Sequence, residues 1–333
     1  MPQPHCLVSL RTAISAVWAH RRTAAVLLTV VAAFTVGAVL PSAVAEPSHR
    51  HGEFEELLVP SRMGPVKVQV QWADGDGAAA LYLLDGLRAL PSGNGWAVHT
   101  DATELFGHDN VTLVMPVGGE SSWYADWSSR SSLNGQAVPY RWETFLTTEL
   151  PDFLARYGID RTRTAVAGLS MGASAALALA ANHRDQFVHA TALSGLLDWS
   201  LPWVREAMRL AALQGGGYDL TALAPPDSPR WQRLDPAALA PALAGLPMYI
   251  SAASGIPGPA DSLDNPEAAA ATIAGIGLEA GALISTRSFE QRLRALNIAV
   301  VVDYPATGTH SWPYWGSQLA AARPQILAAL GVE

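Results

Sequence analysis

Residues 164–182 read TAVAGLSMGASAALALAAN, and this stretch decides the fold. The short apolar run at 164–168 predicts a buried strand, and the alanine-rich run at 171–182 predicts a helix. Between them lies the pattern G-x-S-x-G, whose two glycines permit a sharp turn that presents a serine at the carboxyl end of a sheet. Ser170 is therefore the candidate nucleophile. A serine that merely completes a turn is the alternative, which the order of strand, turn and helix disfavours.

Other short apolar runs predict the remaining strands of the sheet. They alternate with helix-like stretches, which is typical of an α/β protein whose mostly parallel sheet has helices on both faces. Together with the serine turn, this order predicts the α/β-hydrolase fold. We expect 46–62 to be irregular and 46–333 to form a single domain. The predicted strands are residues 66–71 (at an edge or half-buried), 79–84, 111–117, 164–168, 190–194, 247–251 and 299–304, and the predicted helices are 142–156, 171–182 and an inserted 202–213.

A serine nucleophile needs a base, and histidine is the usual one. In this fold the chain order is serine, acid, histidine, which favours His310, in a loop after the last predicted strand. We expect His183 and His189 to be surface residues. The carboxylate that would orient His310 stays open on pattern alone. The candidates between Ser170 and His310 are Asp235, Asp261, Asp264, Glu267, Glu279, Glu290 and Asp303.

Composition excludes several classes of function. The chain has 333 residues and a formal net charge of −8, which argues against nucleic-acid binding because phosphate backbones require a basic surface. The one cysteine, Cys6, excludes a disulfide framework, thiol catalysis in the main domain and a cysteine-based zinc site. We therefore predict no metal, no cofactor and no nucleic-acid partner.

The first 45 residues have the order of a secretory signal peptide. Arg11, Arg21 and Arg22 precede an apolar run at 23–39, and Ala43-x-Ala45 supplies the small residues of a cleavage site. We predict that 1–45 is a signal peptide and that the protein is secreted. An uncleaved membrane anchor is the alternative, since the run is close to the length of a short spanning helix.

Several long motifs give the chain a family resemblance. It resembles the antigen 85 mycolyltransferases, which are relatives of the esterase D group, over nearly all of residues 46–333. The motifs are YLLDGLRA at 82–89, NGW at 94–96, MPVGGESSWYADW at 115–127, WETFLT at 142–147, GLSM at 168–171 and GTHSWPYW at 308–315.

The resemblance implies an acyltransferase of the cell envelope. Such an enzyme moves a mycolyl chain from one trehalose monomycolate to another, or to arabinogalactan, through an acyl-serine intermediate. The implied acid is Glu279, in a Leu-Glu segment upstream of Phe289, and the implied insertion over the active site is 196–219. The implied oxyanion donors are the amides of Leu87 and Met171, and the implied trehalose contacts are Asp85, Arg88 and Trp312.

Purely structural roles remain as alternatives for some of these residues. Asp85 could cap a turn, and Arg88 could pair with a surface carboxylate. Trp123, Tyr124 and Trp127 could line a sugar or lipid groove or pack in the core, and Gly118 and Gly119 are expected to serve backbone geometry.

Two other functions compete with acyl transfer between sugars. A secreted carboxylesterase would use the same triad with water as the acceptor. A family member without catalysis would bind carbohydrate or host protein, which an intact serine, glutamate and histidine disfavour. The predicted partners are trehalose mycolates or related glycolipids and sugar acceptors, with peripheral contact to the cell envelope. The sequence leaves the acyl-chain length, the acceptor and the oligomeric state open.

Overall fold

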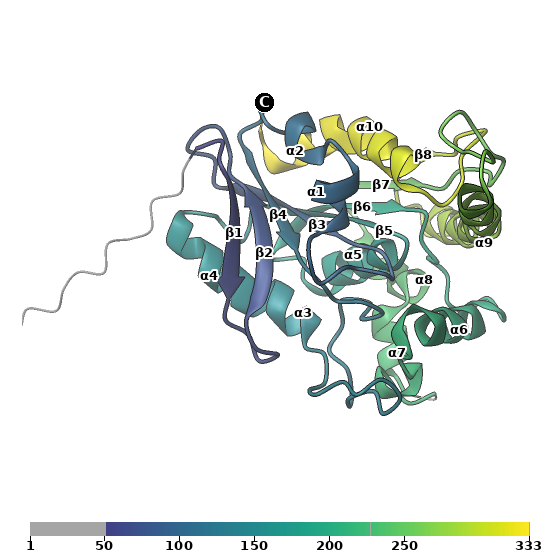
Figure 1. The fold of residues 1–333 in the computed structure, drawn as a ribbon. Coiled ribbons are helices and arrows are strands. Elements are labelled where there is room, and N and C mark those ends of the chain that lie inside the picture. Colours follow the sequence, from purple (N-terminus) through teal and green to yellow (C-terminus); the bar gives the residue numbers. More distant parts are fainter. Residues whose placement is uncertain (1–50, 227, 333) are drawn as a thin grey trace, which may run out of the picture. The chain divides into compact units, whose positions relative to one another are not determined.

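Within residues 51–226 and 228–332, which the computed structural model describes, eight strands form one sheet in the order β1-β2-β4-β3-β5-β6-β7-β8 (Figure 1). β1 and β2 are antiparallel to their neighbours, and all pairs from β4 to β8 are parallel. The strands are β1 (Phe54–Val59), β2 (Val66–Gln71), β3 (Ala79–Leu84), β4 (Val111–Pro116), β5 (Thr164–Leu169), β6 (Phe187–Leu193), β7 (Met248–Ser251) and β8 (Val301–Asp303). The predicted mostly parallel sheet is confirmed. The predicted signal peptide and Cys6 lie outside the described residues.

Helices cover both faces of this sheet. Successive side chains of the buried strands point to opposite faces of the sheet, so each face has its own apolar cluster. One cluster contains Tyr82 and Leu84, and the other contains Leu81 and Leu83. The first cluster packs under α3 to α5, and the second packs under α1, α2 and α10. The helices are α1 (Gly95–His99), α2 (Ala102–Leu105), α3 (Trp142–Thr144), η1 (Phe145–Glu149), α4 (Leu150–Leu154), η2 (Ala155–Tyr157), α5 (Met171–Asn182), α6 (Val204–Gly216), η3 (Leu220–Ala222), α7 (Arg230–Leu234), α8 (Pro236–Leu239), η4 (Ala240–Leu243), α9 (Pro266–Ala295) and α10 (Trp312–Leu330).

The first strand corrects the expectation of an irregular segment at 46–62. β1 pairs with β2 over its whole length and takes the edge of the sheet, so β2 lies one place further in. The sequence FEELLV has two adjacent glutamates and two adjacent leucines, so polar and apolar residues do not alternate, and only Val59 of β1 is fully buried. An edge strand that meets solvent on most of its surface carries little periodic signal.

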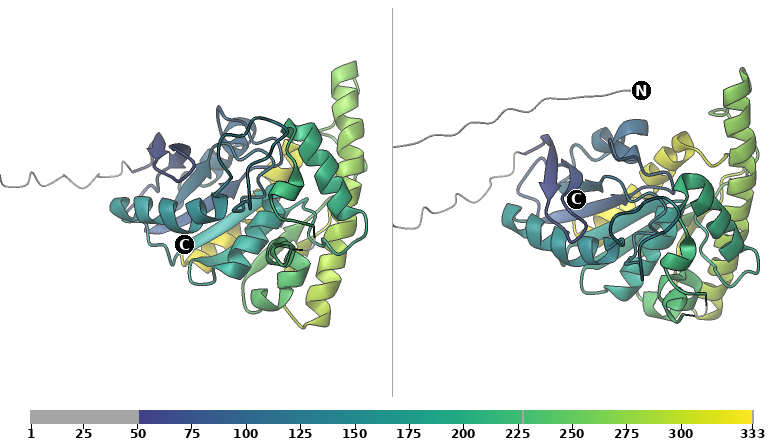
Figure 2. Two further views of the ribbon diagram at one scale, coloured as in Figure 1. Left: turned by 90° about the horizontal axis from the view of Figure 1, so that it is seen from below. Right: turned by 60° about the horizontal axis from the view of Figure 1, so that its bottom comes forward.

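Helix α9 is the longest element and lies at one side of the domain. Its N-terminal part extends past the neighbouring helices in both views of Figure 2. Asn265 caps it by accepting a hydrogen bond from the Ala268 amide, and Pro266 occupies the first turn, where no helical N–H is needed. Among the described residues it is the helix whose length and composition would suit a membrane span. Its buried residues include Glu279, which belongs to the candidate site described below.

The expectation that His189 is a surface residue is wrong. Its side chain is fully buried on β6, where Nε2 lies 3.3 Å from Oε1 of Gln325 on α10. Burial lowers the pKa of His189 from 6.5 to about 4, and the hydrogen bond with Gln325 opposes that shift. His183 is partly buried, with Nε2 2.9 Å from Oε1 of Glu143.

The buried histidine should make the fold acid-sensitive. Between pH 6.5 and about 4 an unfolded chain protonates His189 while the folded protein does not, so stability falls as the pH falls, by about 1.4 kcal/mol per pH unit. The free energy of unfolding should therefore fall by about 3 kcal/mol less on acidification in His189→Gln than in the wild type. Urea unfolding at pH 7 and pH 4.5 measures it, with the exposed His108→Gln as control. Asp85 opposes the trend, since burial raises its pKa to about 6. An unchanged pH dependence in His189→Gln would contradict the prediction.

Candidate active site

Ser170 lies at the sharp turn between β5 and α5. Its backbone has φ 52° and ψ −116°, and its N–H donates to the Leu193 carbonyl at 2.8 Å. Both flanking glycines are required by close backbone approach. A Cβ on Gly168 would lie 2.2 Å from the Gly172 carbonyl oxygen, and one on Gly172 would lie 2.5 Å from the Asp85 carbonyl oxygen. The turn therefore holds Ser170 in a left-handed conformation that a serine seldom adopts alone.

His310 lies between Ser170 and Glu279. Its Nε2 is 2.9 Å from Ser170 Oγ, and its Nδ1 is 2.8 Å from Glu279 Oε2. Its ring meets the ring of Trp315 edge to face at 4.9 Å. With Nδ1 protonated toward the carboxylate, Nε2 is free to accept the serine proton.

Glu279 is the carboxylate that the structure brings to His310. It is 1% exposed, and its other oxygen, Oε1, accepts hydrogen bonds from Ser194 Oγ at 2.8 Å and from the Ala253 amide at 2.7 Å. Three donors thus compensate the burial of this charge. A glycine, Gly275, lets α9 approach the loop, since a Cβ there would lie 3.2 Å from Thr309 Cβ.

The other acids considered lie elsewhere or have other partners. Asp261 accepts from Thr309 Oγ1 and Tyr314 OH, and so joins its own loop to the histidine loop. Asp235 caps α8, Glu290 binds Arg294 and Tyr304, and Asp303 binds Tyr249 and Gln318, while Asp264 and Glu267 are exposed.

Of the two predicted oxyanion donors, Met171 follows the serine directly in the chain and Leu87 lies one residue from a neighbour of the serine. Met171 is the first residue of α5, so its amide belongs to the unsatisfied N–H groups of a helix N-terminus. Leu87 follows Gly86, where a Cβ would lie 3.6 Å from Ser170 Cβ. Met171 and Gly86, the residue before Leu87, therefore lie next to Ser170.

A loop at 118–124 with a strained backbone packs against Met171 and Asp85. Five of its residues have positive φ: Gly118, Gly119, Ser121, Trp123 and Tyr124. The Trp123 amide contacts Met171 Sδ at 3.2 Å, and Tyr124 OH accepts from the Asp85 amide at 2.9 Å. Trp123, Tyr124 and Trp127 are all buried, so they pack in the core and line no open groove. The expectation that Gly118 and Gly119 serve backbone geometry is confirmed.

Asp85 and Trp312 both lie against Gly95, at the start of α1. Asp85 is 2% exposed, and its Oδ2 accepts from the Gly95 amide at 2.8 Å, so it does anchor the start of α1. Burial raises its pKa to about 6. A Cβ on Gly95 would strike both Trp312 and Asp85. Arg88 is exposed at the same edge of the sheet.

Sequence reasoning missed Ser194 and Ala253 as partners of Glu279. Both follow the carboxyl ends of parallel strands, β6 and β7, which end at the same edge as β5. That placement was the available signal, since ligand and catalytic groups collect at this edge. Trp315 Nε1 also donates to Ser194 Oγ at 3.0 Å.

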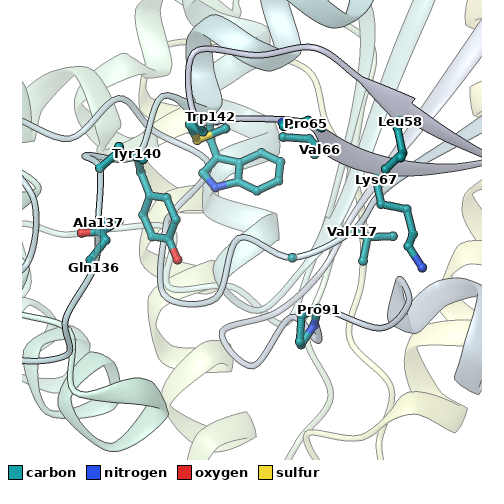
Figure 3. Close-up of a pocket in the computed structure, with 13 residues that line it drawn as sticks. Leu58, Pro65, Val66, Lys67, Pro91, Val117, Gln136, Ala137, Tyr140 and Trp142 are labelled. Atoms are coloured by element: carbon teal, nitrogen blue, oxygen red, sulfur yellow. The ribbon is translucent and has the colours of Figure 1, made fainter. Parts of the chain in front are cut away.

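A separate cavity of about 360 Å³ has Val117 and Gly118 in its lining (Figure 3). Its lining is mostly apolar, comes from the β1–β2 hairpin and the 136–142 segment, and includes none of Ser170, His310 and Glu279. We therefore do not assign it to the chemistry. Among the described residues, no cluster of three histidine, cysteine or acidic side chains could hold a metal ion.

The chain is similar to several known proteins. The Esterase family model matches residues 61–326. The diacylglycerol acyltransferase/mycolyltransferase Ag85B of Mycobacterium intracellulare is 41% identical over 284 residues, covering 83% of each chain. Ag85C of Mycobacterium leprae is 37% identical over 321 residues, covering 94% of this chain and 93% of the relative.

Solved structures show the same fold. Mycobacterium tuberculosis MPT51 (FbpC1) has a TM-score of 0.70 at 30% identity and covers 84% of this chain and 99% of its own. The serine hydrolase FphF of Staphylococcus aureus has a TM-score of 0.61 at 17% identity, covering 84% and 99%, which shows the shared fold alone. The resemblance read from the motifs is thereby confirmed. This chain belongs to the antigen 85 family of acyltransferases, which have the α/β-hydrolase fold.

Proposed function

We propose that this acyltransferase moves mycolyl groups between trehalose esters, or to arabinogalactan, through an acyl-Ser170 intermediate. One observation carries the proposal: His310 lies within hydrogen-bond distance of both Ser170 and Glu279. The relatives are named diacylglycerol acyltransferase/mycolyltransferase, and these names suggest that the acyl group is a mycolyl group.

The first half of the reaction acylates the enzyme. His310 Nε2 takes the proton of Ser170 Oγ while Oγ attacks the ester carbonyl of the donor. The amides of Leu87 and Met171 stabilise the oxyanion that forms, and Glu279 stabilises the charged imidazole. The C–O bond to the sugar then breaks, and His310 gives the proton to the departing sugar oxygen, which leaves as a hydroxyl.

The second half repeats these steps with a new hydroxyl. His310 takes the proton of the acceptor, whose oxygen attacks the acyl carbon, and the collapse releases Ser170 Oγ, which regains its proton. Asp85, Arg88 and Trp312 would hold the sugar, since a sugar site needs fixed polar groups beside an aromatic surface. If water replaces the sugar, the same steps give hydrolysis.

We place this reaction at the cell envelope. Residues 1–45 would direct export as a signal peptide, and 46–333 would form the mature domain. Exposed apolar side chains on α9, namely Ile273, Leu278 and Ile284, support peripheral contact with a lipid surface.

The test is product analysis with trehalose monomycolate as the lipid substrate. We expect the purified protein to form trehalose dimycolate, and to form more of it than free mycolic acid. Free acid as the main product would make the protein an esterase. Absence of turnover, together with binding to trehalose, would favour the carbohydrate-binding alternative.

A further inference from the structure

Three segments lie close together next to the proposed oxyanion site. They are Leu87–Arg88 after β3, Glu120–Ser121 after β4, and Gly215–Gly216 at the end of α6. The Ser121 amide donates to the Leu87 carbonyl at 2.9 Å. A Cβ on Gly215 would lie 3.0 Å from Leu87 Cδ2, so α6 closes over the same place.

The carboxylate of Glu120 packs against the end of α6. A Cβ on Gly216 would lie 2.6 Å from Glu120 Oε2 and 2.8 Å from the ring of Tyr218. The backbone of Glu120 is fixed as well, because its carbonyl accepts from Tyr140 OH at 3.1 Å. Partial burial raises the pKa of Glu120, and the charge of Arg88 opposes that shift.

Glu120 and Arg88 both have unused hydrogen-bonding capacity. Across residues 51–226 and 228–332, neither side chain forms a hydrogen bond, nor an ion pair within 4.0 Å, with the other or with a third residue. A guanidinium only donates, and a carboxylate only accepts. A ligand that satisfies both must offer groups that accept and groups that donate, as sugar hydroxyls do and an acyl chain does not.

We propose that Glu120 is a specificity-determining residue that accepts a hydrogen bond from a hydroxyl of the acceptor sugar, opposite Arg88. The inference rests on the proposed function and adds a residue to it. Because the Ser121 amide donates to the Leu87 carbonyl, Glu120 adjoins the segment proposed to stabilise the oxyanion, and a sugar bound to Glu120 would lie on the side of Ser170 where that segment is. Glu120 also gives the enzyme a means to favour a sugar over water.

The experiment compares two products of one acyl-enzyme. A p-nitrophenyl ester supplies the acyl group without a sugar, and trehalose is the acceptor. The measured quantity is the ratio of acyl-trehalose to free acid as the trehalose concentration rises. Because both products come from the same intermediate, this ratio does not depend on how much enzyme is folded or acylated. We expect Glu120→Gln to lower the ratio about tenfold and Glu120→Ala to lower it further, since a charged hydrogen bond is lost.

A second variant and a control separate the outcomes. Gly216→Ala should displace the Glu120 carboxylate and lower the ratio while leaving residue 120 unchanged. Glu104→Gln, an exposed glutamate on α2, should leave the ratio as in the wild type. A wild-type ratio in both Glu120 variants overturns this inference alone. A wild-type enzyme that forms the acyl-enzyme but never acylates trehalose overturns the proposed function, and this inference with it.

Discussion

Replacing Ser170 by alanine is expected to lower acyl transfer at least about 10⁴-fold, because the variant lacks the oxygen that lies 2.9 Å from His310 Nε2. The substitution keeps Cβ, so the left-handed backbone at φ 52° is no more strained than before. Fold and stability should therefore be retained. The rate of trehalose dimycolate formation measures the loss, and circular dichroism checks the fold.

Labelling with a serine-directed phosphonate provides the control. The wild type should take up one phosphonate, and Ser170→Ala none. Ser317→Ala, at an exposed serine on α10, should label as the wild type does. Transfer by a folded Ser170→Ala protein at a tenth or more of the wild-type rate would contradict the assigned nucleophile.

The second large effect is expected at Glu279. Glu279→Gln should lower the rate of transfer about 10⁴-fold, because an amide nitrogen cannot accept the His310 Nδ1 proton or compensate a charged imidazole. The same residue accepts from Ser194 and Ala253, so an amide would also have to rearrange these contacts. Steady-state rates with a p-nitrophenyl ester measure the loss apart from any effect on sugar binding.

A second carboxylate on α9 offers a matched control. Glu290 is 8% exposed and binds Arg294 and Tyr304, away from His310. Glu290→Gln should cost stability but leave the chemical step within about threefold, as expected for a residue outside the catalytic unit. Equal losses in the two variants would mean that the acid acts through the stability of α9 and not through His310.

The serine turn could be predicted from local sequence because its causes are local. A strand, two close-packed glycines and an alanine-rich helix lie within nineteen consecutive residues, and the structure forms them at β5 and α5. His310 followed from chain order. Glu279 did not follow from pattern, because its meeting with His310 depends on where α9 packs. Only the family resemblance indicated it.

The predictions that fail concern residues whose surroundings depend on packing against distant parts of the chain. His189 is polar and was expected at the surface, yet β6 lies inside the sheet and α10 covers it. β1 was missed because its pairing with β2, and not its own periodicity, makes it a strand. Helix α9 was also absent from the expected elements, although the Asn265-Pro266 cap was a readable start signal.

Detection of the acyl-enzyme tests most directly whether Ser170 is the nucleophile. Wild type and Ser170→Ala would be incubated briefly with trehalose monomycolate, digested and analysed by mass spectrometry. We expect one mycolyl group on the wild-type peptide that contains Ser170, and no acylated peptide from the variant. Formation of trehalose dimycolate without that adduct, or an adduct on another residue in both proteins, would contradict it.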